Sequence, residues 1–91
     1  MPNLQVVSLS MNKISSLEIF QSLAHLKELY LRKNAISDIW EINYLSELHE
    51  LEILWLRDNP VEHHRLYRLF TIKTIKSLKK LDDTEVTYEE R

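Results

Sequence analysis

Apolar residues recur along residues 26–50 at a spacing that fits neither a regular helix nor a regular strand. The positions are Leu26, Leu29, Leu31, Ile36, Ile39 and Leu45, with the polar Asn34 among them. A helix would present an apolar residue every three or four positions, and a half-buried strand would alternate without interruption. The pattern instead predicts a short strand, a polar turn at Asn34 and a looser return segment. Such a unit cannot bury its apolar edge alone, so it requires a similar unit stacked on each side.

Matching units flank this segment on both sides. The upstream unit repeats the pattern 22 residues earlier, counted from Leu26 back to Leu4, and the downstream unit starts 25 residues later, at Leu51. Leu78 and Leu81 restart the pattern once more, without its asparagine. We therefore expect an α/β solenoid, with a short parallel sheet on its concave face and short helices or turns on its convex face.

The third repeat is followed by a segment with a different spacing. Pro60 suits the first position of a helix, and apolar residues then recur at helical spacing through residues 61–76. We expect this stretch to form one C-terminal capping helix, which buries Leu69 and Phe70 against the open edge of the last coil. The expected organisation is one domain over residues 1–91, with repeats at about 4–25, 26–50 and 51–77 and a cap at about 60–84.

Each repeat carries an asparagine at its turn, namely Asn12, Asn34 and Asn59. The chain contains no glycine, so its turns cannot rely on the residue that most easily adopts positive φ. We expect the turns to depend on asparagine and proline instead, with the three amides bonding backbone groups of their own and adjacent coils. A buried amide is tolerated only when its hydrogen bonds are satisfied. We therefore predict a buried, structural asparagine ladder rather than a catalytic site.

Two aromatic residues, Trp40 and Tyr44, lie four positions apart on the return segment of the second repeat. That segment is three residues longer than its counterpart in the first repeat, and Ser37 or Asp38 precedes it as a helix cap. We expect a fuller helical turn there. Residues four apart share one face of a helix, and we expect both rings to pack on the convex side rather than to form a ligand site.

Residues that alternate with the buried leucines must point out of the concave face of the sheet. In phase, they form three rows: Ser8, Tyr30, Trp55 and Asp82; Ser10, Arg32, Arg57 and Thr84; and Val6, Glu28, Ile53 and Lys80. Strands about 4.8 Å apart would bring Tyr30 beside Trp55. Arg32 would lie beside Arg57 in the next row. Aromatic residues and arginine dominate binding hot spots.

The sequence therefore predicts a partner-binding surface on the concave face. Its members are Glu28, Tyr30, Arg32, Ile53, Trp55, Arg57 and Lys80. The alternative is that aromatic–arginine stacking merely covers the sheet. An outward tryptophan on a short exposed sheet otherwise invites self-association, so we favour recognition of a partner.

The bulk composition favours a binding domain without catalytic chemistry. The chain has 91 residues, a formal net charge of −2 and no cysteine, so it offers no electrostatic case for binding nucleic acid or an anionic membrane. His63 and His64 are adjacent on the predicted helix, so their side chains diverge by about 100°. His25 and His49 occupy equivalent repeat positions. We therefore expect no metal, no cofactor and no enzyme activity.

The N-terminal edge of the predicted solenoid has no shield. Leu4, Val7 and Leu9 face a neighbouring coil on one side only, and the residues before them are too few to cover the other side. Pro2 also lacks a backbone donor and so hinders strand pairing at this edge. We expect residues 1–14 to self-associate or to be mobile, unless a preceding repeat completes the edge.

The coil pattern LxxLxLxxNxI resembles the phosphatase-regulator-like class of leucine-rich repeats. The stretch LWLxxNP at residues 54–60, a helix after it and LKKLD at residues 78–82 resemble the C-terminal cap of that class. More narrowly, the extended second coil and the LWLxxNP stretch are similar to the leucine-rich domain of a cilia- and flagella-associated family. That resemblance covers nearly the whole chain. In that family a further repeat precedes the position that matches Asn3, which agrees with the open N-terminal edge, and we expect the chain to be incomplete there. An oligomerising helical tail also follows in that family, whereas this sequence stops shortly after Glu90.

The resemblance implies a non-catalytic protein-interaction scaffold of the cilium, flagellum or basal body. Its partner would be a protein, with ciliary proteins and kinases as candidates. The alternative is a spliceosomal small nuclear ribonucleoprotein subunit, because the stretch around Tyr67 and Arg68 also resembles the A-prime protein of such a particle. The leucine-rich light chain of outer-arm dynein is a more distant third. No segment resembles a signal peptide or a membrane span, so we expect a cytoplasmic location at the cytoskeleton, or a nuclear one for the alternative.

Overall fold

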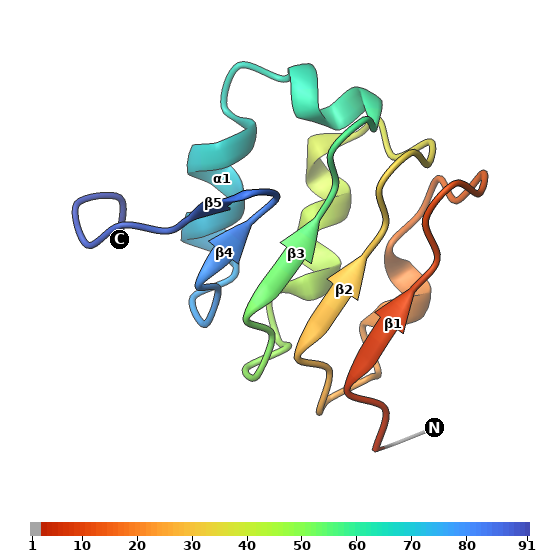
Figure 1. The fold of residues 1–91 in the computed structure, drawn as a ribbon, viewed down its shortest axis with the longest axis horizontal. Helices are drawn as coiled ribbons and strands as arrows, with labels where there is room; N and C mark the ends of the chain where they lie inside the picture. Colours follow the sequence, from red (N-terminus) through yellow and green to blue (C-terminus); the bar gives the residue numbers. More distant parts are fainter. Residues whose placement is uncertain (1–2) are drawn as a thin grey trace.

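Four short parallel strands, one from each successive coil, build the sheet that carries the fold (Figure 1). The computed structural model describes residues 3–91. The strands are β1 (Val6–Ser8), β2 (Glu28–Tyr30), β3 (Ile53–Trp55) and β4 (Lys80–Leu81), followed by β5 (Thr84–Glu85). The helical elements are η1 (Glu18–Phe20), η2 (Ile39–Leu45), η3 (Pro60–His63) and α1 (Tyr67–Thr74). The sheet forms one layer and the helical elements form the other, so the predicted leucine-rich solenoid is confirmed.

The register of the strands follows the phase of the sequence repeats. Val7, Leu29 and Leu54 are paired in successive strands, and Leu81 continues this row in β4. The last three are buried, whereas Val7 is only partly buried because β1 is the edge strand in the described part of the chain. The repeat leucines therefore form the core in the order that their spacing predicts.

Successive coils turn through residues with positive φ, at a place that the sequence did not indicate. Met11, Lys33 and Asp58, each just before a repeat asparagine, have φ of 61°, 60° and 66°. The expectation that asparagine and proline would form these turns is therefore wrong in detail. The asparagine bonds the backbone, while the residue before it adopts the left-handed conformation at a cost of about 1–2 kcal/mol.

The capping segment is not one continuous helix, contrary to the prediction for residues 61–76. The 3₁₀ turn η3 ends at His63; the next residue, His64, is extended with a φ of −67° and a ψ of 133°, and α1 begins at Tyr67. The N–H of Val61 donates to the carbonyl of Ile36 at 2.9 Å, which ties η3 to the second coil. The helix α1 packs against η2 instead, and one straight helix could not satisfy both contacts.

The break also changes which face of the cap is buried. The buried positions of the cap are Val61, Tyr67, Thr71, Ile72 and Ile75. Leu69, predicted to be buried, is 54% exposed, and Phe70 is only partly buried. Because the extended His64 between η3 and α1 resets the helical phase, spacing counted through the break assigned Leu69 to the wrong face.

The fourth coil ends at Asp82, where the chain reverses into a strand that the sequence did not predict. Asp82 has a φ of 57°, and β5 then pairs antiparallel with β4. In the earlier coils, the N–H of Leu9 donates to the carbonyl of Tyr30 and that of Leu31 to the carbonyl of Trp55, both at 2.9 Å. At the matching place, the N–H of Leu56 donates to the Asp82 carboxylate at 2.8 Å. A side-chain oxygen thus replaces the missing strand carbonyl.

The opposite end of the stack is the open edge at β1. Val6 and Leu9 are exposed there, and Leu4 is only partly buried. Pro2, expected to hinder pairing at this edge, lies outside the described residues. Within residues 3–91, no helix has the length and apolar character needed to cross a bilayer.

Candidate protein-interaction site

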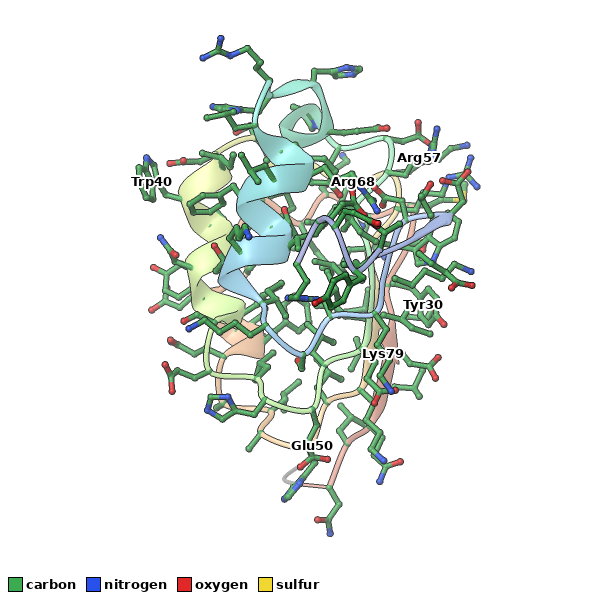
Figure 2. All side chains as sticks on the ribbon, turned by 90° about the vertical axis from the view of Figure 1, so that its left-hand side faces the viewer. Tyr30, Trp40, Glu50, Arg57, Arg68 and Lys79 are labelled. Carbon is green, nitrogen blue, oxygen red and sulfur yellow. The ribbon has the colours of Figure 1, made fainter. Side chains whose placement is uncertain are left out.

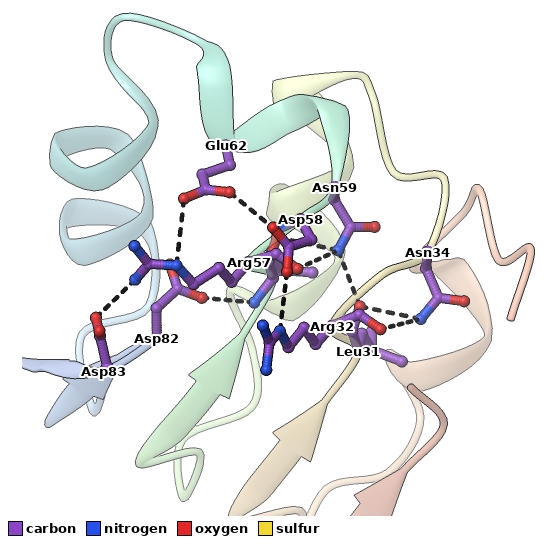
Figure 3. Close-up of polar contacts among 10 residues, drawn as sticks. Leu31, Arg32, Asn34, Arg57, Asp58, Asn59, Glu62, Asp82 and Asp83 are labelled. Atoms are coloured by element: carbon purple, nitrogen blue, oxygen red, sulfur yellow. Dashed lines mark hydrogen bonds and ion pairs between the residues drawn. The ribbon is translucent and has the colours of Figure 1, made fainter. Parts of the chain in front are cut away.

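Asparagine amides fix the turns that lead out of the concave strands (Figure 3). Asn59 is 1% exposed; its Oδ1 accepts the N–H of Ile36 at 3.0 Å, and its Nδ2 donates to Leu31 O at 2.9 Å. Asn34 repeats the arrangement one coil earlier: its Oδ1 accepts the N–H of Ile14 at 3.1 Å, and its Nδ2 donates to Leu9 O of the preceding coil at 3.1 Å. Its Nδ2 also donates to Leu31 O, in its own coil, at 2.9 Å. The shared carbonyl of Leu31 therefore links the two amides across coils.

Asn12 does not have the buried environment predicted for it. Its side chain is exposed, and its Nδ2 donates only within its own coil, to Leu9 O at 2.7 Å and Ser10 O at 3.1 Å. The bonds that Asn34 and Asn59 make to the preceding coil have no counterpart at Asn12, because no coil precedes it among the described residues. The ladder is therefore graded from an exposed first member to a buried third one.

The concave face carries Tyr30 and Trp55 side by side on β2 and β3. Glu28 and Ile53 pair one step earlier in the same strands, and Lys80 continues their row on β4. The Tyr30 hydroxyl donates to Glu28 Oε1 at 2.6 Å, and this hydrogen bond is the main cause that raises the pKa of Tyr30 above its usual value. All five side chains are half-buried, so they form the floor of the concave face and still meet solvent.

The two concave arginines are held by carboxylates of the next coil (Figure 3). Arg32 Nε lies 2.9 Å from Asp58 Oδ2, and this hydrogen bond leads the interactions that lower the Asp58 pKa. Arg57 Nη1 lies 2.8 Å from Asp83 Oδ1, and its Nε lies 3.8 Å from Glu62 Oε2. Both arginine side chains keep about half of their surface in solvent, 50% for Arg32 and 41% for Arg57. They form an oriented polar rim beside Tyr30 and Trp55, the two rings that make up the aromatic floor of the concave face.

The sequence missed the acidic half of this rim. Asp58 and Asp83 each follow their arginine by 26 residues, so the same separation was present in both pairs. The rows predicted from spacing placed Asp82 and Thr84 on the concave face instead. Asp82 is buried, because its Oδ2 accepts the hydroxyl of Tyr67 at 2.9 Å, and Thr84 has turned into β5.

A groove of about 370 Å³ lies over the aromatic floor. It is lined by Ser10, Tyr30, Arg32, Trp55 and Lys80. Four of these belong to the predicted surface, and the groove therefore joins the floor to one arginine of the rim. Glu28 and Ile53 do not line the groove, but they pair with each other two residues before Tyr30 and Trp55 in the same strands. Arg57 also lies outside the lining and is paired with Asp83.

The histidines are distributed as repeat and cap positions. His25 Nδ1 lies 3.0 Å from Glu50, and His49 Nε2 lies 3.5 Å from Glu47. Within residues 3–91, no cluster of three or more histidine, aspartate or glutamate side chains could hold a metal ion.

A profile described as leucine-rich repeat matches residues 1–91, which is the whole chain. The chain belongs to the leucine-rich repeat family. Among similar members, mouse and human cilia- and flagella-associated protein 410 are 44% and 45% identical to it, each over 99% of the chain. The chain spans 37% and 36% of the length of these relatives.

Solved structures of leucine-rich repeat proteins share this fold. The Drosophila melanogaster SNF/U2A' complex contains a chain that superposes with a TM-score of 0.89 at 22% identity, covering 98% of this chain and 52% of that chain. The Mex67 leucine-rich repeat domain of Chaetomium thermophilum gives a TM-score of 0.81 at 29% identity, covering 94% of this chain and 61% of that chain. The first likeness, at its low identity, shows the fold alone.

Proposed function

We propose that this leucine-rich repeat domain is the non-catalytic interaction module of a ciliary or basal-body scaffold, and that a partner protein binds its concave groove. Family membership and the similar cilia- and flagella-associated proteins support a protein-interaction scaffold. The ciliary location rests on the printed names of those relatives.

The observation that carries the choice of face is the aromatic floor under a charged rim. Tyr30 and Trp55 are rigidly registered on neighbouring strands, so a partner would lose little by ordering them. The paired arginines offer charge-assisted donors without the freedom of unpaired side chains. Half-buried aromatic anchors beside arginine are the composition that dominates binding hot spots.

The alternative function is a subunit of a spliceosomal ribonucleoprotein particle. The resemblance of the stretch around Tyr67 and Arg68 to the A-prime protein favours it, but the likeness to the SNF/U2A' complex, at 22% identity, supports a common fold rather than a common partner. The formal net charge of −2 also gives no electrostatic attraction to RNA. Localisation of a fluorescently tagged chain separates the two functions, because the ciliary proposal requires signal at the basal body rather than in the nucleus.

The concave site is tested by pull-down with wild type and Trp55→Ala, compared by quantitative mass spectrometry. We expect the partner to be depleted from the material recovered with Trp55→Ala. Its binding free energy should weaken by at least about 2 kcal/mol with either Trp55→Ala or Arg57→Ala. Arg65→Ala is the matched control, since Arg65 is an exposed arginine of the cap. Circular dichroism should show that all three variants are folded. Equal recovery of the same proteins by wild type and Trp55→Ala would disprove the concave site.

A second copy of the chain is a further proposed partner, at a different place. The edge strand β1 has free backbone groups on its outer side within the described residues, and Val6 and Leu9 are exposed beside them. Such an edge can pair with another strand. This association would leave the aromatic floor at Tyr30 and Trp55 available.

A further inference from the structure

The convex side carries an exposed tryptophan where packing was expected. Trp40 is 65% exposed, and its ring contacts that of Phe70 edge to face, at a centroid distance of 5.4 Å and an interplanar angle of 83°. Figure 2 shows Trp40 on the opposite side of the molecule from Tyr30 of the concave face. Tyr44, its neighbour one turn later, does pack against the core. Trp40 therefore packs against Phe70 on the convex side but leaves most of its surface in solvent, whereas Tyr44 is partly buried.

A groove of about 510 Å³ opens beside this ring. Trp40 and Tyr44 contribute two aromatic walls, and Glu41 and Glu47 contribute two carboxylates. The amide side chains of Gln21 and Asn43 also line it. The lining, all within the described residues, contains acidic and aromatic groups but no lysine or arginine.

The walls of this groove are held in place by local contacts. The Asp38 carboxylate accepts the N–H of Trp40 at 2.9 Å and caps η2, so the backbone that carries the ring is fixed. The contact with Phe70 supports the ring from the side of α1. Glu41 Oε1 accepts the N–H of Leu17 at 2.8 Å, which orients one carboxylate between η1 and η2. The groove is therefore largely formed before any ligand arrives.

We propose that this groove binds a cationic side chain, lysine or arginine, presented by a basic peptide segment of a partner protein. A cation over an aromatic face is attracted by the ring quadrupole, and tryptophan is the best of the aromatic residues for this contact. The nearby carboxylates attract the same charge. The apolar stem of lysine or arginine fits against the rings while its charged head meets Glu47. An acidic peptide would meet repulsion from both carboxylates, so charge complementarity selects the basic one.

The probe for this site is the peptide (Lys-Leu-Ser)₄, with a lysine-acetylated copy and (Glu-Leu-Ser)₄ as controls. Binding is followed by NMR through the Trp40 indole N–H, at peptide concentrations up to about 1 mM. We expect the lysine peptide to shift this signal saturably and both control peptides to bind at least fivefold more weakly. Equal shifts with all three peptides, or no shift with the lysine peptide, would overturn the proposal.

Variants then assign the binding to the groove. Trp40→Ala and Glu47→Gln should each weaken binding of the lysine peptide at least fivefold. Because Trp40→Ala removes the indole N–H, its binding is followed through the backbone amides of η2. Both side chains are exposed, so the fold should tolerate the changes. Glu89→Gln makes the same change in net charge outside the groove lining and should bind like wild type. Trp55→Ala should also bind like wild type, so failure of the concave site and failure of this groove give different results. The proposal that the lysine peptide binds in this groove would be refuted if Trp55→Ala or Glu89→Gln weakened its binding as much as Trp40→Ala does.

Discussion

Removal of one buried amide should measure how much the asparagine ladder contributes to stability. In Asn59→Ala, the N–H of Ile36 loses its acceptor in a buried environment. The carbonyl of Leu31 still accepts from Asn34, and the carbonyl of Leu56 still accepts the backbone N–H of residue 59. One backbone donor is therefore left unsatisfied, while both carbonyls keep a partner. The cost of such a donor is about 1–3 kcal/mol, and the lost side-chain bonds raise the expected destabilisation to about 2–4 kcal/mol.

The same reasoning gives a graded series for the three asparagines. Asn34→Ala leaves the N–H of Ile14 without its acceptor, but this group is only partly buried, so we expect a destabilisation of about 1–2 kcal/mol. Asn12 is exposed and bonds only its own coil, so Asn12→Ala should cost about 0.5 kcal/mol. A ladder of three equivalent buried amides would instead give three equal losses.

Urea unfolding followed by tryptophan fluorescence and circular dichroism measures the series. A domain of this size should unfold in one transition, with the midpoint shifted and the slope unchanged. Each kcal/mol of destabilisation should lower the melting temperature by about 4–8 °C, so Asn59→Ala should melt at least about 8 °C below wild type. A loss at Asn12 as large as that at Asn59 would refute the graded ladder, and no loss at Asn59 would refute the hydrogen-bond account itself.

Three further predictions concern the cap and the open edge. Tyr67→Phe leaves Asp82 Oδ2 without its donor and should lower stability by about 1–2 kcal/mol in urea unfolding; no change would mean that this buried bond contributes nothing. Hydrogen bonding with Arg68 is the leading cause that lowers the pKa of Glu90 from 4.5 to about 2, so its stabilisation is present above about pH 4.5 and is lost as the pH falls toward 2. Glu90→Gln should thus be less stable than wild type at pH 6 and equal to it near pH 2, whereas parallel pH profiles would contradict the assignment. Sedimentation should detect association that Val6→Lys abolishes, and a wild-type chain that stays monomeric at high concentration would exclude pairing through this edge.

The repeat phase could be predicted from sequence because it rests on a local rule applied several times. Leu29, Leu54 and Leu81 take the same register position because each coil faces the same packing requirement. The cap follows no repeat, and its course depends on tertiary contacts such as the bond from Val61 to Ile36. Helical spacing alone could not reveal that break, and the exposed Leu69 is its direct consequence.

The concave site could be predicted as rows but not as contacts. Alternation along strands was sufficient to bring Tyr30 and Trp55 together. It could not show that Arg32 would turn toward Asp58, because ion pairing depends on side-chain reach across coils. Nor could it anticipate that Asp82 turns inward, since that orientation depends on the hydroxyl of Tyr67 in the cap.

The placement of the aromatic floor follows from the difference between the two ends of the stack. At one end, Asp82 and the cap close the fourth coil, and the core beside them is buried. At the other end, Asn12 and Val6 are exposed, and β1 has a neighbour on one side only among the described residues. Local opening is expected where few apolar contacts and many exposed backbone groups coincide, and among the described residues both coincide at the first coil. A recognition surface centred on β1 would therefore lose affinity each time that coil opened. Tyr30 and Trp55 lie on β2 and β3, the strands paired on both sides, so we expect the floor to keep its geometry when the first coil opens.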